Sequence, residues 1–179
     1  PRSTLFPTRR SSDLEKYSSA IQWLIDYGLI ERCYNLSIPE FPLEGNKVQE
    51  IFKLFFTDSG LLVSQLDEGT AGHILTGDLG IYKGAIYEES FADAYLKNGK
   101  KLYYFSKESG LEIDFISQDY NEVVLIEVKA KDGRTKAALE VLNNKEKYKD
   151  VKKIIRLKDC NVGGSSNIET YPSYMSFLI

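Results

Sequence analysis

The chain has 179 residues, of which 42% are hydrophobic and 27% are charged, and this balance excludes a wholly disordered protein. No apolar run approaches the ~20 residues that a membrane helix needs, so we expect no membrane partner. The net charge of −3 excludes a uniformly basic nucleic-acid-binding protein, but not a local basic patch. The two cysteines, Cys33 and Cys160, have no metal-ligand or disulfide spacing, and their use fits a reducing, cytoplasmic location.

Basic residues are concentrated in one segment. Residues 129–158 contain eleven lysines and arginines against four acidic residues, whereas the part of the chain before them is acidic overall. Such a segment is typical either of a lysine-rich helix with solvated side chains or of a surface that contacts phosphate groups. Composition alone leaves both interpretations open.

The N-terminal part of the chain divides into two segments. Residues 1–13 are rich in Arg, Ser and Thr, lack apolar periodicity, and are predicted to be a disordered or non-native tail. From Leu14 the apolar residues take helical spacing, and Gly28 stands where a helix-ending glycine is expected. A strand over 29–36, a turn-rich stretch and a second strand follow. Residues 14–62 therefore have the order of elements of a partial winged-helix segment.

A carboxylate is predicted to face the interior in the next segment. The glycine-rich stretch over 69–80 predicts a loop, and residues 84–97 predict a helix. On this helix Glu88 shares a stripe with apolar residues, whereas Glu89 and Asp93 are predicted to fall outside that stripe. The alternative is that Glu88 lies at the edge of the stripe, near the helix N-terminus, where the helix dipole favours a carboxylate.

Three strands are predicted next, over residues 101–106, 111–117 and 122–129. If Tyr120 and Asn121 form the two-residue turn of a hairpin, then Asp114 lies directly opposite Glu127. Lys129 follows two positions after Glu127, on the same side of its strand. The sequence therefore predicts that two acids and one lysine converge, provided that the hairpin has this register.

The convergence of these charges has an energetic consequence. Two carboxylates about 5 Å apart repel by roughly 3 kcal/mol at an effective dielectric near 20, and Lys129 recovers about 2 kcal/mol of this. A third carboxylate from Glu88 leaves surplus negative charge, which a bound proton or a divalent cation can neutralise. Hard oxygen ligands favour Mg²⁺ or Mn²⁺. The structural alternative is a salt bridge between Lys129 and its acidic neighbours.

These residues carry a resemblance to a known superfamily. Asp114, followed by Glu127-Val128-Lys129 at the end of an apolar strand, resembles the Asp…(Asp/Glu)-x-Lys signature of the restriction-endonuclease-like (PD-(D/E)XK) nucleases. An inward glutamate on the preceding helix, here Glu88, also recurs in that superfamily. The resemblance implies a Mg²⁺- or Mn²⁺-dependent nuclease.

The order of elements extends this resemblance. The predicted order of elements matches the superfamily core (α-β-β-β-α-β). A helix and three strands are followed by a helix over 135–148 and a strand over 152–158. The expected fold is mixed α/β, with a nuclease-like domain over 63–179 after the partial winged-helix segment. The strings GAIYEESFADAYL, LYYFSKESGLEIDFI and VVLIEVKA are also similar to the C-terminal domain of unknown function of bacterial and archaeal AAA-type ATPases. Because the chain has no glycine-rich loop ending in Lys-Ser/Thr, the ATPase module of that family is expected to be missing from it.

The roles implied by the resemblance can be stated residue by residue. The implied catalytic residues are Glu88, Asp114, Glu127 and Lys129. The implied metal ligands are Asp114, Glu127, the carbonyl of Val128, and Glu88. Three basic residues just beyond are candidates for contacts with nucleic-acid phosphates: Lys131, Arg134 and Lys136. Two alternatives remain: a non-catalytic DNA- or partner-docking module with the nuclease fold, or a scaffold in which Lys129 pairs with Glu127 and no cation binds.

Overall fold

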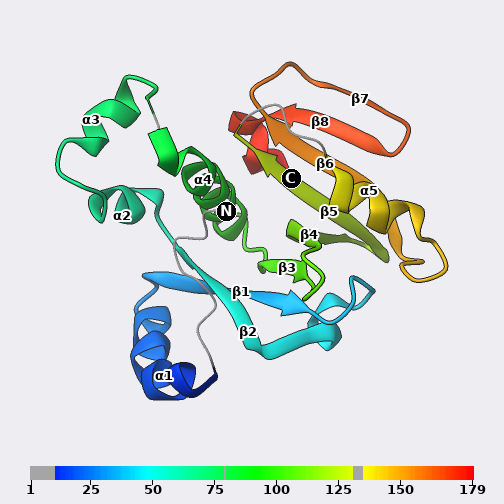
Figure 1. Ribbon diagram of the computed structural model, residues 1–179, viewed down its shortest axis with the longest axis horizontal. Coiled ribbons are helices and arrows are strands. Elements are labelled where there is room, and N and C mark those ends of the chain that lie inside the picture. The colour runs from blue at the N-terminus through cyan, green and yellow to red at the C-terminus, as the bar shows by residue number, and fades with distance from the viewer. Residues whose placement is uncertain (1–10, 79, 131–134) are drawn as a thin grey trace.

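The computed structural model describes residues 11–78, 80–130 and 135–179 (Figure 1), and the side chains of residues 11–15 and 81 stand outside this description. In these ranges eight strands form a single sheet with the order β2-β1-β3-β4-β5-β6-β8-β7. The strands are β1 (Ile30–Leu36), β2 (Lys47–Phe56), β3 (Tyr103–Ser106), β4 (Glu112–Asp119), β5 (Glu122–Lys129), β6 (Val151–Lys158), β7 (Gly163–Ser165) and β8 (Ile168–Pro172). The sheet is mixed, because β1–β3, β5–β6 and β6–β8 pair in parallel and the other neighbours are antiparallel.

Helices pack against both faces of this sheet. The α-helices are α1 (Ser11–Asp26), α2 (Ser59–Ser64), α3 (Thr70–Leu75), α4 (Lys83–Lys97) and α5 (Lys136–Asn143). Three 3₁₀ turns complete the described elements: η1 (Leu43–Asn46), η2 (Gly80–Tyr82) and η3 (Ser173–Leu178). None of the helices in the described ranges combines the length and the hydropathy of a membrane span.

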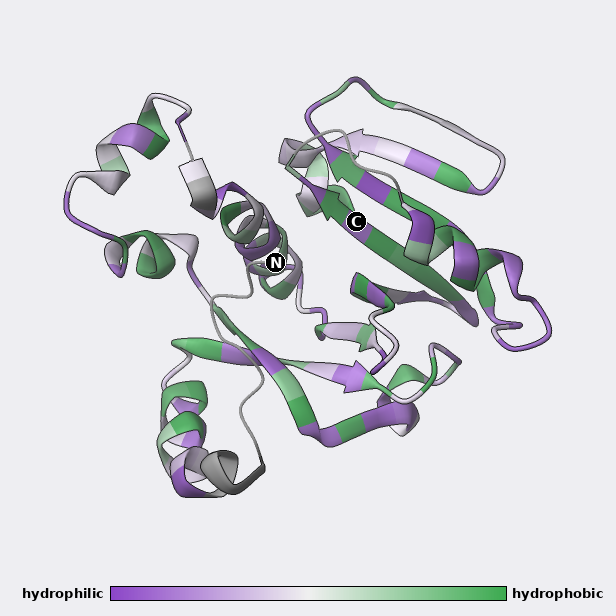
Figure 2. Cartoon of the chain, in the orientation of Figure 1, coloured by the Kyte–Doolittle hydropathy of each residue, from purple (hydrophilic) through white to green (hydrophobic). Residues whose placement is uncertain are grey.

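The central strand β5 is buried on both faces. Val124, Ile126 and Val128 belong to the core beneath α4, and the alternate residues Val123 and Leu125 belong to the core beneath α5. Figure 2 shows hydrophobic residues along nearly the whole of β5. A strand covered by helices on both sides reads as a continuous apolar run, which is why its bounds could be predicted without error.

The predicted hairpin register is confirmed. Asp119 pairs with Glu122, and the ladder continues without a shift to Phe115 and Ile126. Tyr120 takes a positive φ of 50°, as a tight two-residue hairpin turn requires. The mixed α/β class is also confirmed, and from α4 to β6 the elements follow the predicted order.

Several strand ends shift by one or two residues, and three helical boundaries differ more from the prediction. Residues 69–80 are not one loop, because α3 forms between Gly69 and Gly77, which both have a φ of 85°. The glycines therefore mark the two ends of a short helix. Helix α5 ends at Asn143 and is shorter than predicted. Helix α1 already begins at Ser11, and the rest of the predicted tail lies outside the described residues.

The N-terminal hairpin is continuous with the rest of the sheet. Strands β1 and β2 pair with each other, and Tyr34 and Asn35 of β1 pair in parallel with Tyr103 and Tyr104 of β3. The predicted order of helix, strand, loop and strand is present in residues 14–62. This pairing brings β2 and α2 against the side of α4 (Figure 1).

Candidate functional site

Asp114 is held where two central strands separate. The last paired residues of the β4–β5 ladder are Phe115 and Ile126, and Asp114 is the neighbour of Phe115 on β4. Beyond it, the backbone N–H of Val128 donates a hydrogen bond of 2.9 Å to Oδ2 of Asp114. Because a buried backbone donor needs an acceptor, this bond fixes the Asp114 carboxylate between β4 and β5.

Lys129 joins the two predicted acids. Its Nζ lies 3.0 Å from Oδ2 of Asp114 and 2.5 Å from Oε2 of Glu127. The exposed fraction of the side chain is 12% for Asp114, 4% for Glu127 and 25% for Lys129. Solvent screens such shielded charges little, so these contacts are stronger than those of surface pairs. The structure therefore brings two of the predicted catalytic acids, Asp114 and Glu127, to the ammonium group of Lys129, which is also a predicted catalytic residue.

The Lys129 ammonium keeps its charge in this position. Burial acts to lower the pKa of Lys129, but the carboxylates of Asp114 and Glu127 outweigh burial, and the pKa ends above its ordinary value. A permanent cation therefore lies between the two acids at neutral pH.

Glu88 approaches the cluster from α4. Its side chain is half-buried, and burial raises the pKa of the Glu88 carboxyl to about 7, a rise to which the nearby Asp114 carboxylate adds. The charges of Lys53 and Lys129 act in the opposite direction. Glu88 thus interacts electrostatically with the charges of the cluster.

A second lysine, Lys53, enters the site from β2 and was not found by sequence reasoning. Its Nζ lies 2.8 Å from Oε1 of Glu112 on β4 and 4.7 Å from the centre of the Tyr104 ring. Burial acts to lower the pKa of Lys53, but Glu112 and Glu88 outweigh burial, and the pKa ends raised. In the sequence, a lysine among apolar strand residues gives no signal of burial, because lysines usually point to solvent.

Glu89 and Asp93 are both buried, although they fall outside the stripe that Glu88 shares with apolar residues. Glu89 accepts a hydrogen bond from the backbone of Phe56 at the end of β2. Asp93 accepts two hydrogen bonds from Ser59, at 3.4 Å from the backbone and 3.3 Å from the hydroxyl, and its Oδ1 lies 2.6 Å from Nζ of Lys97. The reason is that β2 and α2 cover a second side of α4, which a single helical stripe does not reveal.

Burial of Glu89 predicts a pH-dependent stability. Burial raises the pKa of Glu89 from 4.5 to about 8, and the charge of Asp93 adds to the rise. Between these pH values the unfolded chain has lost the proton and the folded chain keeps it. The free energy of unfolding should therefore fall as pH rises, by about 1.4 kcal/mol per pH unit from this group alone.

Urea unfolding of the native chain and Glu89→Gln, in EDTA between about pH 5 and pH 8, measures this effect. The glutamine variant should lose this part of the slope, whereas Glu146→Gln, a change at an exposed acid, should keep it. Equal slopes for the native chain and Glu89→Gln would contradict the prediction.

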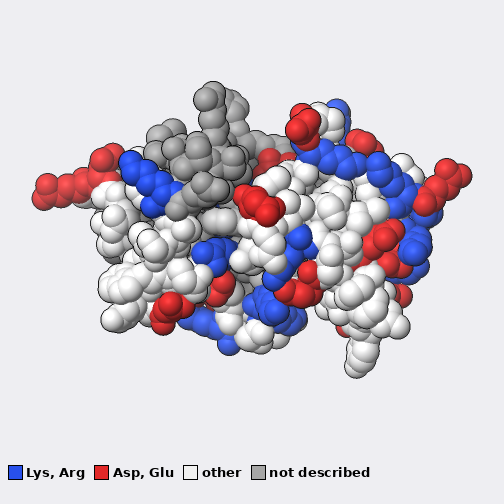
Figure 3. Space-filling model, turned by 90° about the horizontal axis from the view of Figure 1, so that it is seen from below, with Lys and Arg blue, Asp and Glu red and all other residues white. Residues whose placement is uncertain are grey.

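The predicted phosphate-contacting residues are described only in part. Lys136 is exposed at the first position of α5, while Lys131 and Arg134 lie outside the described residues. On the face shown in Figure 3, basic side chains are interspersed with acidic ones. The described part of this face therefore presents mixed charge.

The residues around Lys129 include the two carboxylates that could hold a divalent cation. Within the described ranges, no group of three or more acidic, histidine or cysteine side chains is arranged to hold a metal ion. Mg²⁺ does not need such a cage, because it is usually held by one or two carboxylates together with waters and substrate phosphates. Asp114 and Glu127 supply two carboxylates that already face one positive charge.

The fold and the site define a mixed α/β protein with a charged cluster where β4 leaves β5. The family model of a domain of unknown function (DUF4143) matches residues 82–172, half of the chain, and the protein belongs to this family. The matched segment includes Glu88, Asp114, Glu127 and Lys129, whereas Lys53 precedes it. No curated protein and no solved structure matches the chain.

Proposed function

We propose that this protein is a divalent-metal-dependent nuclease that hydrolyses phosphodiester bonds in nucleic acid. The observation that carries the proposal is the contact of Asp114 and Glu127 with one ammonium group, that of Lys129, at the end of a buried strand. In this proposal α4 to β6 is a restriction-endonuclease-like core, and residues 14–62 are the remainder of a winged helix. The partner is an AAA-type ATPase module, as in the ATPases whose C-terminal domain the sequence resembles.

Of the four metal ligands predicted from the sequence, we propose that Asp114, Glu127 and the Val128 carbonyl would hold the ion, because two carboxylates suffice for Mg²⁺. When bound, Mg²⁺ or Mn²⁺ would polarise a phosphodiester oxygen and lower the pKa of a coordinated water. The hydrogen bond from the Val128 N–H holds Asp114 in place for this task. Glu88, on α4, would orient the attacking water.

Lys129 supplies the positive charge of the proposed mechanism. Its ammonium stabilises the negative charge that builds on the phosphate in the transition state, or orients the attacking water. Because both acids already contact Lys129, its position is set before substrate binds. Lys131, Arg134 and Lys136 are proposed to contact phosphates of the nucleic-acid backbone without reading its sequence.

The same contacts favour a second candidate function. Lys129 already neutralises part of the charge of Asp114 and Glu127, so the cluster is also compatible with a docking module that binds DNA or a partner protein without cleavage. In that case the cluster is structural or is a weak metal site.

Two measurements on the same preparations separate these functions. Mg²⁺ or Mn²⁺ should raise the Tm of the native protein, because an ion that binds only the folded state stabilises it, and Asp114→Asn should abolish that gain. Labelled DNA and RNA should be cleaved by the native protein with the ion, and not by Asp114→Asn. Metal binding without cleavage of any substrate would favour the docking module. If neither metal binding nor cleavage is observed, only the interpretation of the cluster as a structural scaffold remains.

A further inference from the structure

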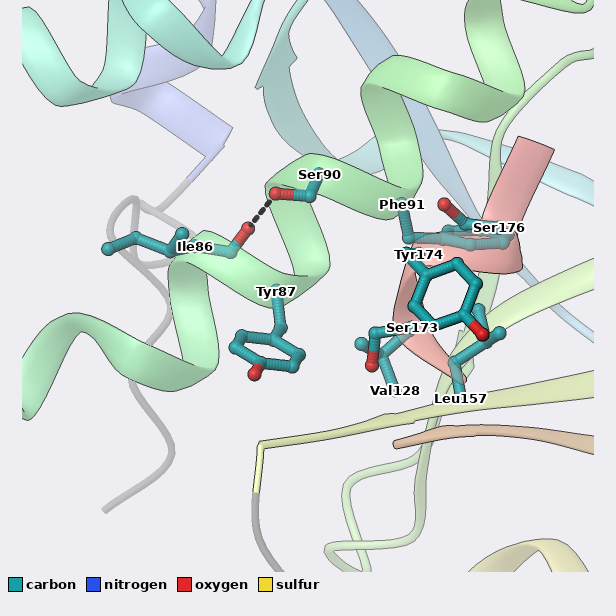
Figure 4. A pocket seen from close by; sticks show the side chains of 9 residues that line it. All are labelled: Ile86, Tyr87, Ser90, Phe91, Val128, Leu157, Ser173, Tyr174 and Ser176. Atoms are coloured by element: carbon teal, nitrogen blue, oxygen red, sulfur yellow. Dashed lines mark hydrogen bonds between the residues drawn. The ribbon is translucent and has the colours of Figure 1, made fainter. Parts of the chain in front are cut away.

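A pocket of about 260 Å³ opens between α4 and the C-terminal turn η3 (Figure 4). Its connection with the site is Val128. The side chain of Val128 lines the pocket, while its backbone N–H holds Asp114. The side chains of Glu127 and Lys129 alternate with that of Val128 along β5, so the pocket and these two charged groups are linked through the backbone around Val128 and not through a shared wall.

The walls of the pocket are suited to a flat ring. Figure 4 shows the rings of Tyr87, from α4, and Tyr174, from η3, on opposite sides of the pocket. Phe91, Val128 and Leu157 supply buried apolar surface between them. Aromatic side chains stack on bases of any sequence, because every base has a π face.

One buried polar group in the wall of the pocket lacks a hydrogen-bond partner among the described residues. Oγ of Ser173 is buried and has no hydrogen-bond partner within the described ranges. By contrast, the hydroxyl of Ser90 donates to the carbonyl of Ile86 at 2.7 Å, so its proton is used (Figure 4). A buried hydroxyl without a partner costs stability, and a ligand that bonds to it removes that cost.

The rim of the pocket carries positive charge. Nζ of Lys83 lies 5.6 Å from the centre of the Tyr87 ring. A cation in this position polarises the ring and can contact a phosphate of a strand whose base enters the pocket. The combination of aromatic walls, a buried hydroxyl and a cation matches how proteins bind single-stranded nucleic acid.

We propose that this pocket receives one unpaired base of the nucleic-acid substrate, so that the protein acts on single-stranded or frayed strands. The volume is below the ~300–1,000 Å³ of pockets for drug-sized ligands, which suits a single ring system. The proposal rests on the proposed function and adds the class of substrate. In this proposal Tyr87 and Tyr174 are the residues that stack on the base.

Anisotropy of labelled oligonucleotides in EDTA tests the pocket without cleavage. The probes are a single-stranded DNA, the same strand as RNA, its blunt duplex, and a single strand with abasic sites. The native protein should bind the normal single strands more tightly than the duplex or the abasic strand. Tyr174→Ala should weaken single-strand binding by roughly 5- to 150-fold, since stacking contributes about 1–3 kcal/mol per base.

Two further variants serve as controls. Tyr174→Phe keeps the ring and should bind like the native protein. Tyr120→Ala removes another exposed tyrosine, at the hairpin turn between β4 and β5, and should have no effect. Because the side chain of Tyr174 is 77% exposed, its removal should leave the fold intact.

The outcomes separate the pocket from the catalytic proposal. Binding that depends on Tyr174 without any cleavage would retain the base pocket and overturn the nuclease. Cleavage with no difference between Tyr174→Ala and Tyr120→Ala, or a native preference for duplex or abasic strand, would overturn the pocket alone. Failure to bind any of the probes would overturn both. The DNA and RNA probes show which sugar the pocket accepts.

Discussion

Replacing Lys129 by methionine is expected to lower the free energy of unfolding by about 3–5 kcal/mol, the usual cost of removing one partner of a buried ion pair. Methionine keeps the length of the side chain but removes the ammonium shared by Asp114 and Glu127. The two acids then repel each other in a site that water screens poorly. Mn²⁺ should restore more stability to Lys129→Met than to the native protein, because the ion can replace the lost positive charge.

Urea unfolding in EDTA and in Mn²⁺ measures both effects. The matched control is Lys101→Met, because Lys101 pairs with Glu44 at 3.0 Å but its side chain is 74% exposed. Such a surface pair contributes about 1 kcal/mol or less. Equal losses for the two variants would contradict a shielded cluster at Lys129.

Replacing Lys53 by methionine is expected to have an effect of similar size. Lys53 is buried, and its ammonium lies 2.8 Å from Glu112. Its removal deprives Glu112 of that partner and Glu88 of a nearby positive charge, so we expect a loss of about 3–5 kcal/mol. The double variant Lys53→Met/Glu112→Met should recover part of this loss, because exchanging both partners for apolar groups is less costly than removing one.

Urea unfolding of the single and double variants tests this expectation. Lys153→Met is the comparison, since Lys153 lies 3.5 Å from Glu169 and both side chains are about one-third exposed. Its loss should stay near 1 kcal/mol or below. A double variant less stable than Lys53→Met would show that Lys53 and Glu112 do not act as a pair.

The part of the site on β4 and β5 could be predicted because the hairpin fixes it. The tight turn at Tyr120 sets the register, and the register places Asp114 near Glu127 and Lys129. The two strands are close together in the sequence and strongly apolar, so the hydrophobic pattern and the turn predict the same register. Sequence reasoning succeeded where neighbouring residues determine the geometry.

The contributions from distant segments could not be predicted. Lys53 reaches the site because β1 pairs with β3 across a long sequence separation, and nothing in the residues around Lys53 indicates that pairing. Glu89 and Asp93 are buried for the same reason, since β2 and α2 return to cover α4. Tyr174 belongs to η3, a C-terminal turn without periodicity, so the pocket emerges only from the folded chain.

Divalent-ion-dependent cleavage by the native protein and Lys129→Ala, prepared identically, tests the central claim most directly. The assay follows nicking of supercoiled plasmid and shortening of a labelled single strand in Mn²⁺, with EDTA as the blank. The account predicts cleavage by the native protein that EDTA abolishes and that Lys129→Ala loses. Cleavage of equal rate by Lys129→Ala, or its persistence in EDTA, would contradict the assignment of catalysis to Asp114, Glu127 and Lys129.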